Sequence, residues 1–444
     1  MTPRRQFFAG LSGLIAASLL PLPLQIRAAT TEMPIRKTGR YKGMESSAQW
    51  RRDAVARIEK LRKGDFHVLV QDAEGRPLPG IELRASQYRH QFGFGAAIKP
   101  SFLFNRGTPE TQQFYRETTS AYFHRITIAN GLKWKHHERL KHEVDTCMKW
   151  CGEQQLPVRG HCLVWPGFRR IPESLSHLRN DPQLLRETIE KHISEFVSKY
   201  DEPLIEWDVL NEPFTEHEFM DLLGPGVVND WFRIAKETNP RLKRYINDYG
   251  VLTRPSKKHQ DFYFDFIHEQ LGSGTAIDGI GFQSHIPARF DPTPPVDLLH
   301  TMDRFAVLGL PLQVTEFDFE TTDRDLQARY TADFITAVFS HPAMTGLITW
   351  SPYEYADGHS SKPDAALFDL RLNERPNGQV WNTLINRDWR TDEMLVTDEA
   401  GRVSFRGFKG AYNLVTTAGG KRLERQVTFK GDGAQNTLTL SENI

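Results

Sequence analysis

Eight short runs rich in apolar and β-branched residues alternate with longer amphipathic segments between about residues 90 and 385 of this 444-residue chain. The runs span residues 92–98, 124–130, 157–165, 205–213, 244–250, 277–285, 310–320 and 346–354. Continuous apolar character is typical of parallel strands that are buried on both faces. The intervening segments, such as 182–200 and 255–272, have helical periodicity. Eight strand–helix repeats predict an α/β fold, a (β/α)8 (TIM) barrel.

Polar or aromatic residues stand at the ends of most of these runs. They are Asn130, Trp165, Glu212, Asp248, His285, Glu316 and Trp350. In a (β/α)8 barrel the reactive side chains gather at the C-terminal ends of the strands. The sequence therefore predicts that these residues face one shared site.

Two glutamates, Glu212 and Glu316, each end an apolar run with a carboxylate. Burying an ionised carboxylate is expensive unless it is paired or hydrogen-bonded, so two such placements indicate a functional site. A pair of carboxylates that face one bond is what acid-catalysed glycoside cleavage requires. One carboxyl must be protonated and the other ionised, and burial with mutual repulsion separates their pKa values.

The neighbours of the two glutamates fit the same chemistry. Asn211 directly precedes Glu212, and its amide is placed to hydrogen-bond a sugar hydroxyl beside the reacting carbon. Asp318 follows Glu316 on the same strand face, and His285 placed between them would orient the nucleophile and keep it ionised. Strand alternation points Asp208 and Asn211 in different directions, so Asp208 is expected to serve the interior of the strand rather than the substrate.

Seven motifs, in order and at matching spacing, resemble those of glycoside hydrolase family 10, the endo-β-1,4-xylanases. They are NGLKW at 130–134, RGHCLVW at 159–165, WDVLNEP at 207–213, NDY at 247–249, GIGFQSH at 279–285, VTEFD at 314–318 and TW at 349–350. The resemblance covers roughly residues 90–385. It implies a retaining hydrolase that cleaves xylan backbones by double displacement and needs neither a metal nor another cofactor.

The resemblance also implies a role for each matching residue. Glu212 would be the general acid and then the base, and Glu316 would be the nucleophile that forms a glycosyl-enzyme. His285, Asp318 and Asn211 would support them. The expected substrate-binding residues are Asn130, Lys133, His161, Trp165, Gln283 and Trp350, with the two tryptophans forming an apolar floor.

Four departures from the family pattern lie around the substrate. This chain has Ala129 where the family has Glu, Pro166 where it has His, and Phe168 where it has Gln. The second tryptophan of the eighth strand has no counterpart in 357–361. They leave two alternatives open: the same chemistry on another β-glycan or a decorated xylan, and, in a different class, a non-catalytic carbohydrate-binding protein.

Two β-rich stretches, at 65–90 and 393–444, lie outside the predicted barrel, and each reads as a strand, an Asp/Gly turn and a second strand. They share the pattern Leu-Val-x-Asp-x-x-Gly-Arg. We expect an N-terminal extension with a β-hairpin at 30–90, the catalytic barrel at 91–385, and a C-terminal segment at 386–444 that packs with the hairpin. This small flanking β-unit serves either as a brace or as a carbohydrate-binding surface.

The first 29 residues predict a twin-arginine signal peptide, because Arg4 and Arg5 precede a short apolar stretch interrupted by Pro21 and Pro23. We therefore expect export to the periplasm or beyond, and no membrane association after signal removal. The formal net charge is zero and the basic residues are scattered, which gives no electrostatic case for nucleic acid. The expected partner is a polysaccharide substrate, and we expect a monomer.

Two further patterns lead to no site. The segment at 137–141 resembles the start of a zinc-protease helix, but Lys141 stands where the second His is needed. His136, His137 and His142 are therefore expected to face solvent on a helix. The three cysteines are expected to be buried small apolar residues. They are Cys147, Cys151 and Cys162.

Overall fold

The computed structural model describes residues 39–253, 256–355, 362–418, 421–431 and 433–440. The predicted signal peptide at 1–29 lies outside these residues. Within the described part of the chain, none of the helices is long and apolar enough to cross a membrane.

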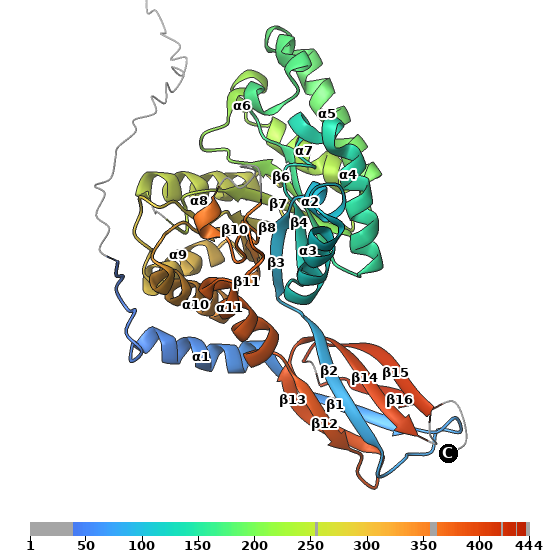
Figure 1. The fold of residues 1–444 in the computed structure, drawn as a ribbon. Coiled ribbons are helices and arrows are strands. Elements are labelled where there is room, and N and C mark those ends of the chain that lie inside the picture. Colours follow the sequence, from blue (N-terminus) through green and yellow to red (C-terminus); the bar gives the residue numbers. More distant parts are fainter. Residues whose placement is uncertain (1–38, 254–255, 356–361, 419–420, 432, 441–444) are drawn as a thin grey trace, which may run out of the picture. The chain divides into compact units, whose positions relative to one another are not determined.

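Eight parallel strands form a closed barrel, which confirms the predicted fold (Figure 1). In order they are β3 (Gly93–Ile98), β4 (Arg125–Ile128), β5 (Val158–Val164), β6 (Leu204–Asn211), β7 (Lys243–Asp248), β8 (Gly279–Phe282), β10 (Leu312–Phe319) and β11 (Met344–Thr349). The ring closes because β11 pairs in parallel with β3. The two-residue strand β9 (His285–Ile286) extends the sheet along β10, with His285 opposite Asp318. All residues of β3, β5 and β10 are buried, as their continuous apolar character predicts.

Helices connect the strands and cover the barrel (Figure 1). The α-helices are α2 (Pro100–Phe104), α3 (Pro109–Tyr122), α4 (Trp134–Glu153), α5 (Pro182–Lys199), α6 (Glu218–Leu223), α7 (Val227–Thr238), α8 (Lys257–Gly272), α9 (Pro295–Ala306), α10 (Arg324–Ser340) and α11 (Pro376–Trp381). Short turns of other helix types are η1 (Phe168–Arg170), η2 (Glu173–Asn180), η3 (Pro363–Ala365) and η4 (Asn382–Asp388).

Several of these helices begin at capping residues. The side chains of Thr108, Asp181 and Asp323 accept a hydrogen bond from a backbone N–H in the first turn of α3, α5 and α10. Pro109 and Pro182 occupy the first helical position, where a missing N–H costs nothing. These local signals fix where each helix starts after its barrel strand.

The flanking β-unit is built from both ends of the chain, as predicted. One sheet has the order β13 (Arg402–Phe408), β1 (Lys63–Gln71), β16 (Gln435–Thr439). The other has the order β12 (Asp392–Val396), β2 (Glu82–His90), β14 (Gly410–Ala418), β15 (Lys421–Phe429). Apolar side chains of the two sheets share one core, in which the ring of Phe66 stacks on that of Phe429 with centroids 4.2 Å apart.

The β-hairpin expected within 30–90 is not formed, because β1 and β2 lie in different sheets. β1 pairs with β13 and β16, and β2 pairs with β12 and β14. Every second residue of β1, including Phe66, Val68 and Val70, is buried on one face. Placing β1 and β2 in facing sheets lets their apolar faces meet in a common core, which a two-stranded hairpin does not provide.

The repeated Leu-Val-x-Asp-x-x-Gly-Arg pattern forms the same turn twice. The carboxylates of Asp72 and Asp398 each accept a hydrogen bond, 2.8 Å long, from the backbone N–H four residues ahead, at Arg76 and Arg402. The glycines before these arginines, Gly75 and Gly401, have φ of 82° and 69°. Glycine adopts this left-handed conformation without a steric penalty, which explains why both turns carry it.

Two expectations about single residues have different outcomes. His137 is buried rather than solvent-facing, because α4 turns it inward, where its Nδ1 lies 3.0 Å from the carbonyl oxygen of Gly131 and its Nε2 3.2 Å from the hydroxyl of Tyr200. The three cysteines are confirmed as buried free thiols. They are Cys147 and Cys151 on α4 and Cys162 on β5.

The barrel is inserted into the β-unit, since β2 ends at His90 just before β3, and β12 starts shortly after η4 (Figure 1). The helix α1 (Gln49–Arg62) leads into β1 and packs on α10. At its end, Arg62 donates hydrogen bonds to the carbonyl oxygens of Phe339, His341 and Met344, at 2.7–2.9 Å. These hydrogen bonds fix the end of α1, the helix that leads into β1, to the barrel.

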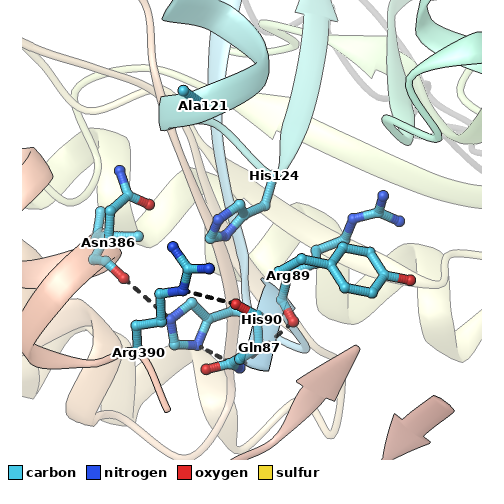
Figure 2. A pocket seen from close by; sticks show the side chains of 9 residues that line it. Gln87, Arg89, His90, Ala121, His124, Asn386 and Arg390 are labelled. Atoms are coloured by element: carbon cyan, nitrogen blue, oxygen red, sulfur yellow. Dashed lines mark hydrogen bonds between the residues drawn. The ribbon is translucent and has the colours of Figure 1, made fainter. Parts of the chain in front are cut away.

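His90 lies at this junction, beside His124 (Figure 2). Its ring packs edge-on against those of Phe94 and Phe408, with centroids 5.3 and 5.6 Å away, and its Nε2 is 3.3 Å from the carbonyl oxygen of Ile385. Burial lowers the pKa of His90 to about 4. The imidazole is therefore neutral in the folded protein at neutral pH.

This buried imidazole predicts acid-dependent stability. The unfolded chain protonates His90 near its ordinary pKa of about 6.5, whereas the folded protein does not, so stability is full above that pH and is lost as pH falls toward 4. Replacing His90 with Phe removes this contribution. The free energy of unfolding of the unmodified protein, minus that of His90→Phe, should fall by roughly 2 kcal/mol between about pH 7.5 and about pH 5 in urea titrations. A difference that stays constant over this range would contradict the prediction.

Candidate active site

Glu212 directly follows β6 and lies at the C-terminal end of the barrel. Its φ of 55° is left-handed, a conformation that costs a non-glycine residue about 1–3 kcal/mol and is typical of functional positions. Its backbone N–H donates to the carbonyl oxygen of Asn247 on β7 at 2.8 Å, which stabilises this turn. Its carboxylate accepts hydrogen bonds from Gln283 Nε2 at 2.9 Å and from Trp165 Nε1 at 3.2 Å.

Glu316 lies within β10 and is buried. Its Oε1 accepts a hydrogen bond from Asn247 Nδ2 at 3.1 Å and is 3.8 Å from His161 Nε2. Its Oε2 is 3.1 Å from His285 Nε2, and the other ring nitrogen of His285 is 2.8 Å from Asp318 Oδ2. The imidazole of His285 therefore lies between the two carboxylates.

Asn247 joins the surroundings of the two glutamates. Its backbone carbonyl holds Glu212, and its side-chain amide donates both to Glu316 and, at 3.0 Å, to Asn211 Oδ1. Its own Oδ1 accepts a hydrogen bond from Thr315 at 2.7 Å. The Nδ2 of Asn211 is buried and has no partner among the described residues, so it is a donor without an acceptor in the site.

The two carboxyls have opposite pKa shifts. Burial raises the pKa of Glu212, and the negative charges of Asp248 and Glu316 add to this effect against the hydrogen bond from Gln283. Burial also opposes ionisation of Glu316, but His161, His285 and Lys133 outweigh it and lower its pKa to about 2. The arrangement thus favours a protonated Glu212 beside an ionised Glu316.

The other predicted site residues surround this pair. Lys133 Nζ donates to Asn130 Oδ1 at 3.0 Å and lies 5.1 and 5.5 Å from the ring centres of Trp165 and Trp350. The ring of His161 packs edge-on against Trp350, with centroids 5.4 Å apart. The structure thus brings the predicted catalytic, supporting and substrate-binding residues into one connected group. The carboxylate of Asp248, also expected to face the site, instead accepts a hydrogen bond from the backbone of Tyr249 at 2.7 Å and lies 3.3 Å from His259 Nε2 on α8.

Asp208 supports the site from the barrel interior. It is fully buried, its Oδ2 is 2.8 Å from His161 Nδ1, and its Oδ1 pairs with Arg159. Arg159 also donates to Glu206 at 3.0 Å. This buried ion-pair layer holds His161 beneath the two glutamates, and the described residues include no cluster of His, Cys, Asp or Glu able to hold a metal ion.

Three residues of the site were not identified from the sequence. Lys362 Nζ donates to both oxygens of Asp318, at 2.8 and 2.9 Å. Arg170 Nη2 is 3.9 Å from Glu212 Oε2 and pairs with Glu216 at 2.8 Å. All three lie outside the barrel strands, where neither periodicity nor a recognised motif marks them.

Three of the departures from the family pattern are used in packing. Ala129 and Phe168 are buried, and the ring of Phe168 packs edge-on against Phe219 with centroids 5.0 Å apart. The carbonyl oxygen of Pro166 accepts a hydrogen bond from the backbone of Phe219 at 3.2 Å. The segment 357–361 lies outside the described residues. The segment after β5 thus packs on α6 through Pro166 and Phe168.

Comparison with known proteins identifies the family of this chain. The family model of Glycosyl hydrolase family 10 matches residues 84–382. The anti-sigma-I factor RsgI6 of Acetivibrio thermocellus is 27% identical over 84% of this chain and 47% of its own length. Endo-1,4-beta-xylanase 1 of Arabidopsis thaliana is 24% identical over 86% of this chain and 40% of its own length. The chain therefore spans less than half the length of these two relatives.

Solved structures show the same barrel. Native xylanase 10B from Thermotoga maritima is 25% identical, with a TM-score of 0.58 over 67% of this chain and 96% of that one. Xylanase 10B from Thermotoga petrophila RKU-1, solved in complex with xylobiose, is 24% identical with a TM-score of 0.59 over 67% of this chain and 94% of its own, which supports the fold. Because the family model matches about two thirds of the chain, the chain belongs to glycosyl hydrolase family 10.

Proposed function

We propose that the chain is a retaining endo-β-1,4-xylanase-type glycoside hydrolase that cleaves xylan backbones by double displacement. The observation that carries the proposal is the pair of carboxyls with opposite pKa shifts, Glu212 and Glu316, within one hydrogen-bonded group. The family membership and the xylanases among the relatives and solved structures support the same activity.

In the first step, Glu316 attacks the anomeric carbon while Glu212 protonates the leaving oxygen, which gives a covalent glycosyl-enzyme. In the second step, Glu212 acts as a base and water releases the sugar. His285 and Asp318 keep Glu316 ionised and fixed in orientation. The route requires a carboxyl–carboxyl separation of about 5–5.5 Å, against about 6.5–9.5 Å for inversion.

The neighbouring residues bind the sugars in this proposal. The unpartnered Nδ2 of Asn211 is available to a hydroxyl beside the reacting carbon. His161 and Gln283 line the same sugar, and Asn130 and Lys133 hold the next one on the non-reducing side. The aromatic floor is formed by Trp165 and Trp350. Bonds to the reacting sugar strengthen as positive charge develops in the transition state.

A second candidate has the same chemistry on another β-glycan or a decorated xylan. It is favoured by Ala129, Pro166 and Phe168, which leave out polar groups that the family pattern has around the substrate. Losing one buried hydroxyl contact weakens binding by roughly 1–3 kcal/mol. Product chromatography on linear xylan, glucuronoarabinoxylan and mixed-linkage glucan separates the candidates, and products from the glucan alone would contradict xylanase activity.

We also propose that the protein is exported through its twin-arginine segment and acts as a monomer on an extracellular or periplasmic polysaccharide. Replacing both Arg4 and Arg5 with Lys should hold the protein inside a bacterial host, because the export machinery reads this pair. Fractionation with immunoblotting measures this, and unchanged export would refute it. Gel filtration of the mature protein measures its apparent molecular mass, and a mass corresponding to a dimer or larger would contradict the monomeric state.

Paired substitutions test the roles of the two glutamates. Glu316→Gln should lower kcat on both xylan and a dinitrophenyl xylobioside by at least about a thousandfold, because no nucleophile remains. Glu212→Gln should cost about 10²–10⁴-fold on xylan but much less in the glycosylation step of the dinitrophenyl substrate, whose leaving group needs no proton. Steady-state and burst kinetics measure both. Equal losses on the two substrates in Glu212→Gln would show that Glu212 is not the acid.

Lys362 is a positioning residue in this account, and Lys362→Met tests it. Burial opposes ionisation of Asp318, and His285 together with Lys362 outweighs it and lowers its pKa. Without Lys362, Asp318 takes up a proton at higher pH and releases His285. We expect kcat/KM to fall roughly tenfold and its acid limb to move to higher pH, with Lys362→Arg restoring both.

The matched control is Lys257→Met, which removes an exposed lysine paired with Asp261 on α8. Its pH profile should superimpose on that of the unmodified protein. If Lys362→Met gave the same profile as this control, Lys362 would have no positioning role.

A further inference from the structure

The loop after β5 places an arginine inside the proposed site. The guanidinium carbon of Arg170 lies 3.5 Å from the ring centre of Trp165, and its Nη2 lies 3.9 Å from Glu212 Oε2. Trp165 Nε1 donates to the same carboxyl oxygen at 3.2 Å. The guanidinium thus stacks on one face of the Trp165 ring and places a positive charge beside the aromatic floor.

A buried carboxylate holds this arginine in place. Glu216 is 3% exposed, and its Oε1 accepts a hydrogen bond from Arg170 Nε at 2.9 Å and from Arg169 Nε at 2.7 Å. A Cβ on Gly167 would lie 2.4 Å from Glu216 Oε2, so glycine is needed for the carboxylate to sit there. Both guanidiniums are therefore positioned before any ligand arrives.

The charges of this group do not cancel. In the described part of the chain, Glu216 is the single carboxylate within hydrogen-bonding distance of Arg169 or Arg170. Glu212 does not neutralise the second arginine in the reactive state, because the general acid is protonated when the substrate binds. Lys133 adds a further positive charge 5.1 Å from the ring centre of Trp165. One side of the site is thus cationic.

We propose that Arg170, supported by Arg169, binds the carboxylate of a uronic acid carried as a branch on the xylan backbone next to the bond that is cleaved. This inference rests on the proposed function and names its preferred substrate as acidic xylan. The guanidinium fork matches a carboxylate in shape and charge, and a neutral branch offers no such pairing. The side chains of Arg170 and Arg169 are 26% and 67% exposed, so a branch can reach them.

Three matched oligosaccharides test the proposal: one with a single uronic acid branch, the same compound with its carboxyl reduced to a primary alcohol, and the unbranched chain. For the unmodified protein, kcat/KM on the acidic compound should exceed that on the reduced one by roughly tenfold. The ratio should fall in about 0.5 M salt, because an exposed ion pair is screened.

Single substitutions assign the preference to residues. Arg170→Gln should bring the ratio of acidic to reduced substrate to about one, and Arg169→Gln should lower it by a smaller factor. Each variant leaves Glu216 with one arginine partner, so the fold is kept, which thermal unfolding checks. The control is Arg233→Gln on α7, an exposed arginine paired with Asp230 and Glu237, which should leave the ratio unchanged.

The outcomes separate this inference from the function on which it rests. A ratio near one in the unmodified protein, with the unbranched chain still cleaved, overturns the acidic-branch site and leaves the xylanase proposal standing. A ratio that persists in Arg170→Gln overturns the assignment to Arg170. If none of the three compounds is cleaved, both the proposed function and the inference fail.

Discussion

The proposed chemistry depends on the burial of two carboxyls at one end of the barrel, because their neighbours shift the two pKa values in opposite directions. Glu212 has hydrogen bonds from one amide and one indole, and nearby negative charge adds to the effect of burial. Glu316 is surrounded by two imidazoles, an amide and a lysine, which favour the ionised form. The same barrel end therefore holds one carboxyl that favours its protonated form beside another that favours its ionised form, as the proposed double displacement requires.

Rigid elements keep this arrangement in place. Glu316 lies in β10 and Glu212 in the turn after β6. Asn247 on β7 donates a hydrogen bond to the Glu316 carboxylate and accepts one from the Glu212 backbone. Below them, Asp208 and Arg159 form a buried ion pair that holds His161. Buried ion pairs contribute little net stability, so their value here is in positioning. Because the barrel is inserted between strands of the β-unit, both ends of the barrel segment connect to that unit. This connection is consistent with the β-unit holding the two ends of the barrel together.

The barrel was predictable from the sequence because continuous apolar runs of this length leave few alternatives. The carboxylates at the ends of two runs also predicted that Glu212 and Glu316 would lie in one group of polar side chains, whereas their catalytic roles remain a proposal. The hairpin prediction was wrong because local turn signals do not reveal which distant strand is the partner, and β1 pairs with strands more than 300 residues away. His137 was misplaced because its polar side chain was expected to face solvent, although it lies on the same buried face of α4 as Val144 and Met148. Lys362 and Arg170 reach the site from segments outside the barrel strands, and only the fold brings them there.

The most direct measurement of the central claim is covalent trapping followed by peptide mass spectrometry. A 2-fluoro xylobioside with a good leaving group should make the glycosyl-enzyme accumulate. The fluorine slows both the formation and the hydrolysis of this intermediate, and the good leaving group speeds up only its formation. We expect a single added disaccharide on the carboxylate of Glu316, found in the peptide that contains this residue, and a loss of activity in proportion to the labelling. Labelling of Glu212, or inactivation without a covalent adduct, would contradict it.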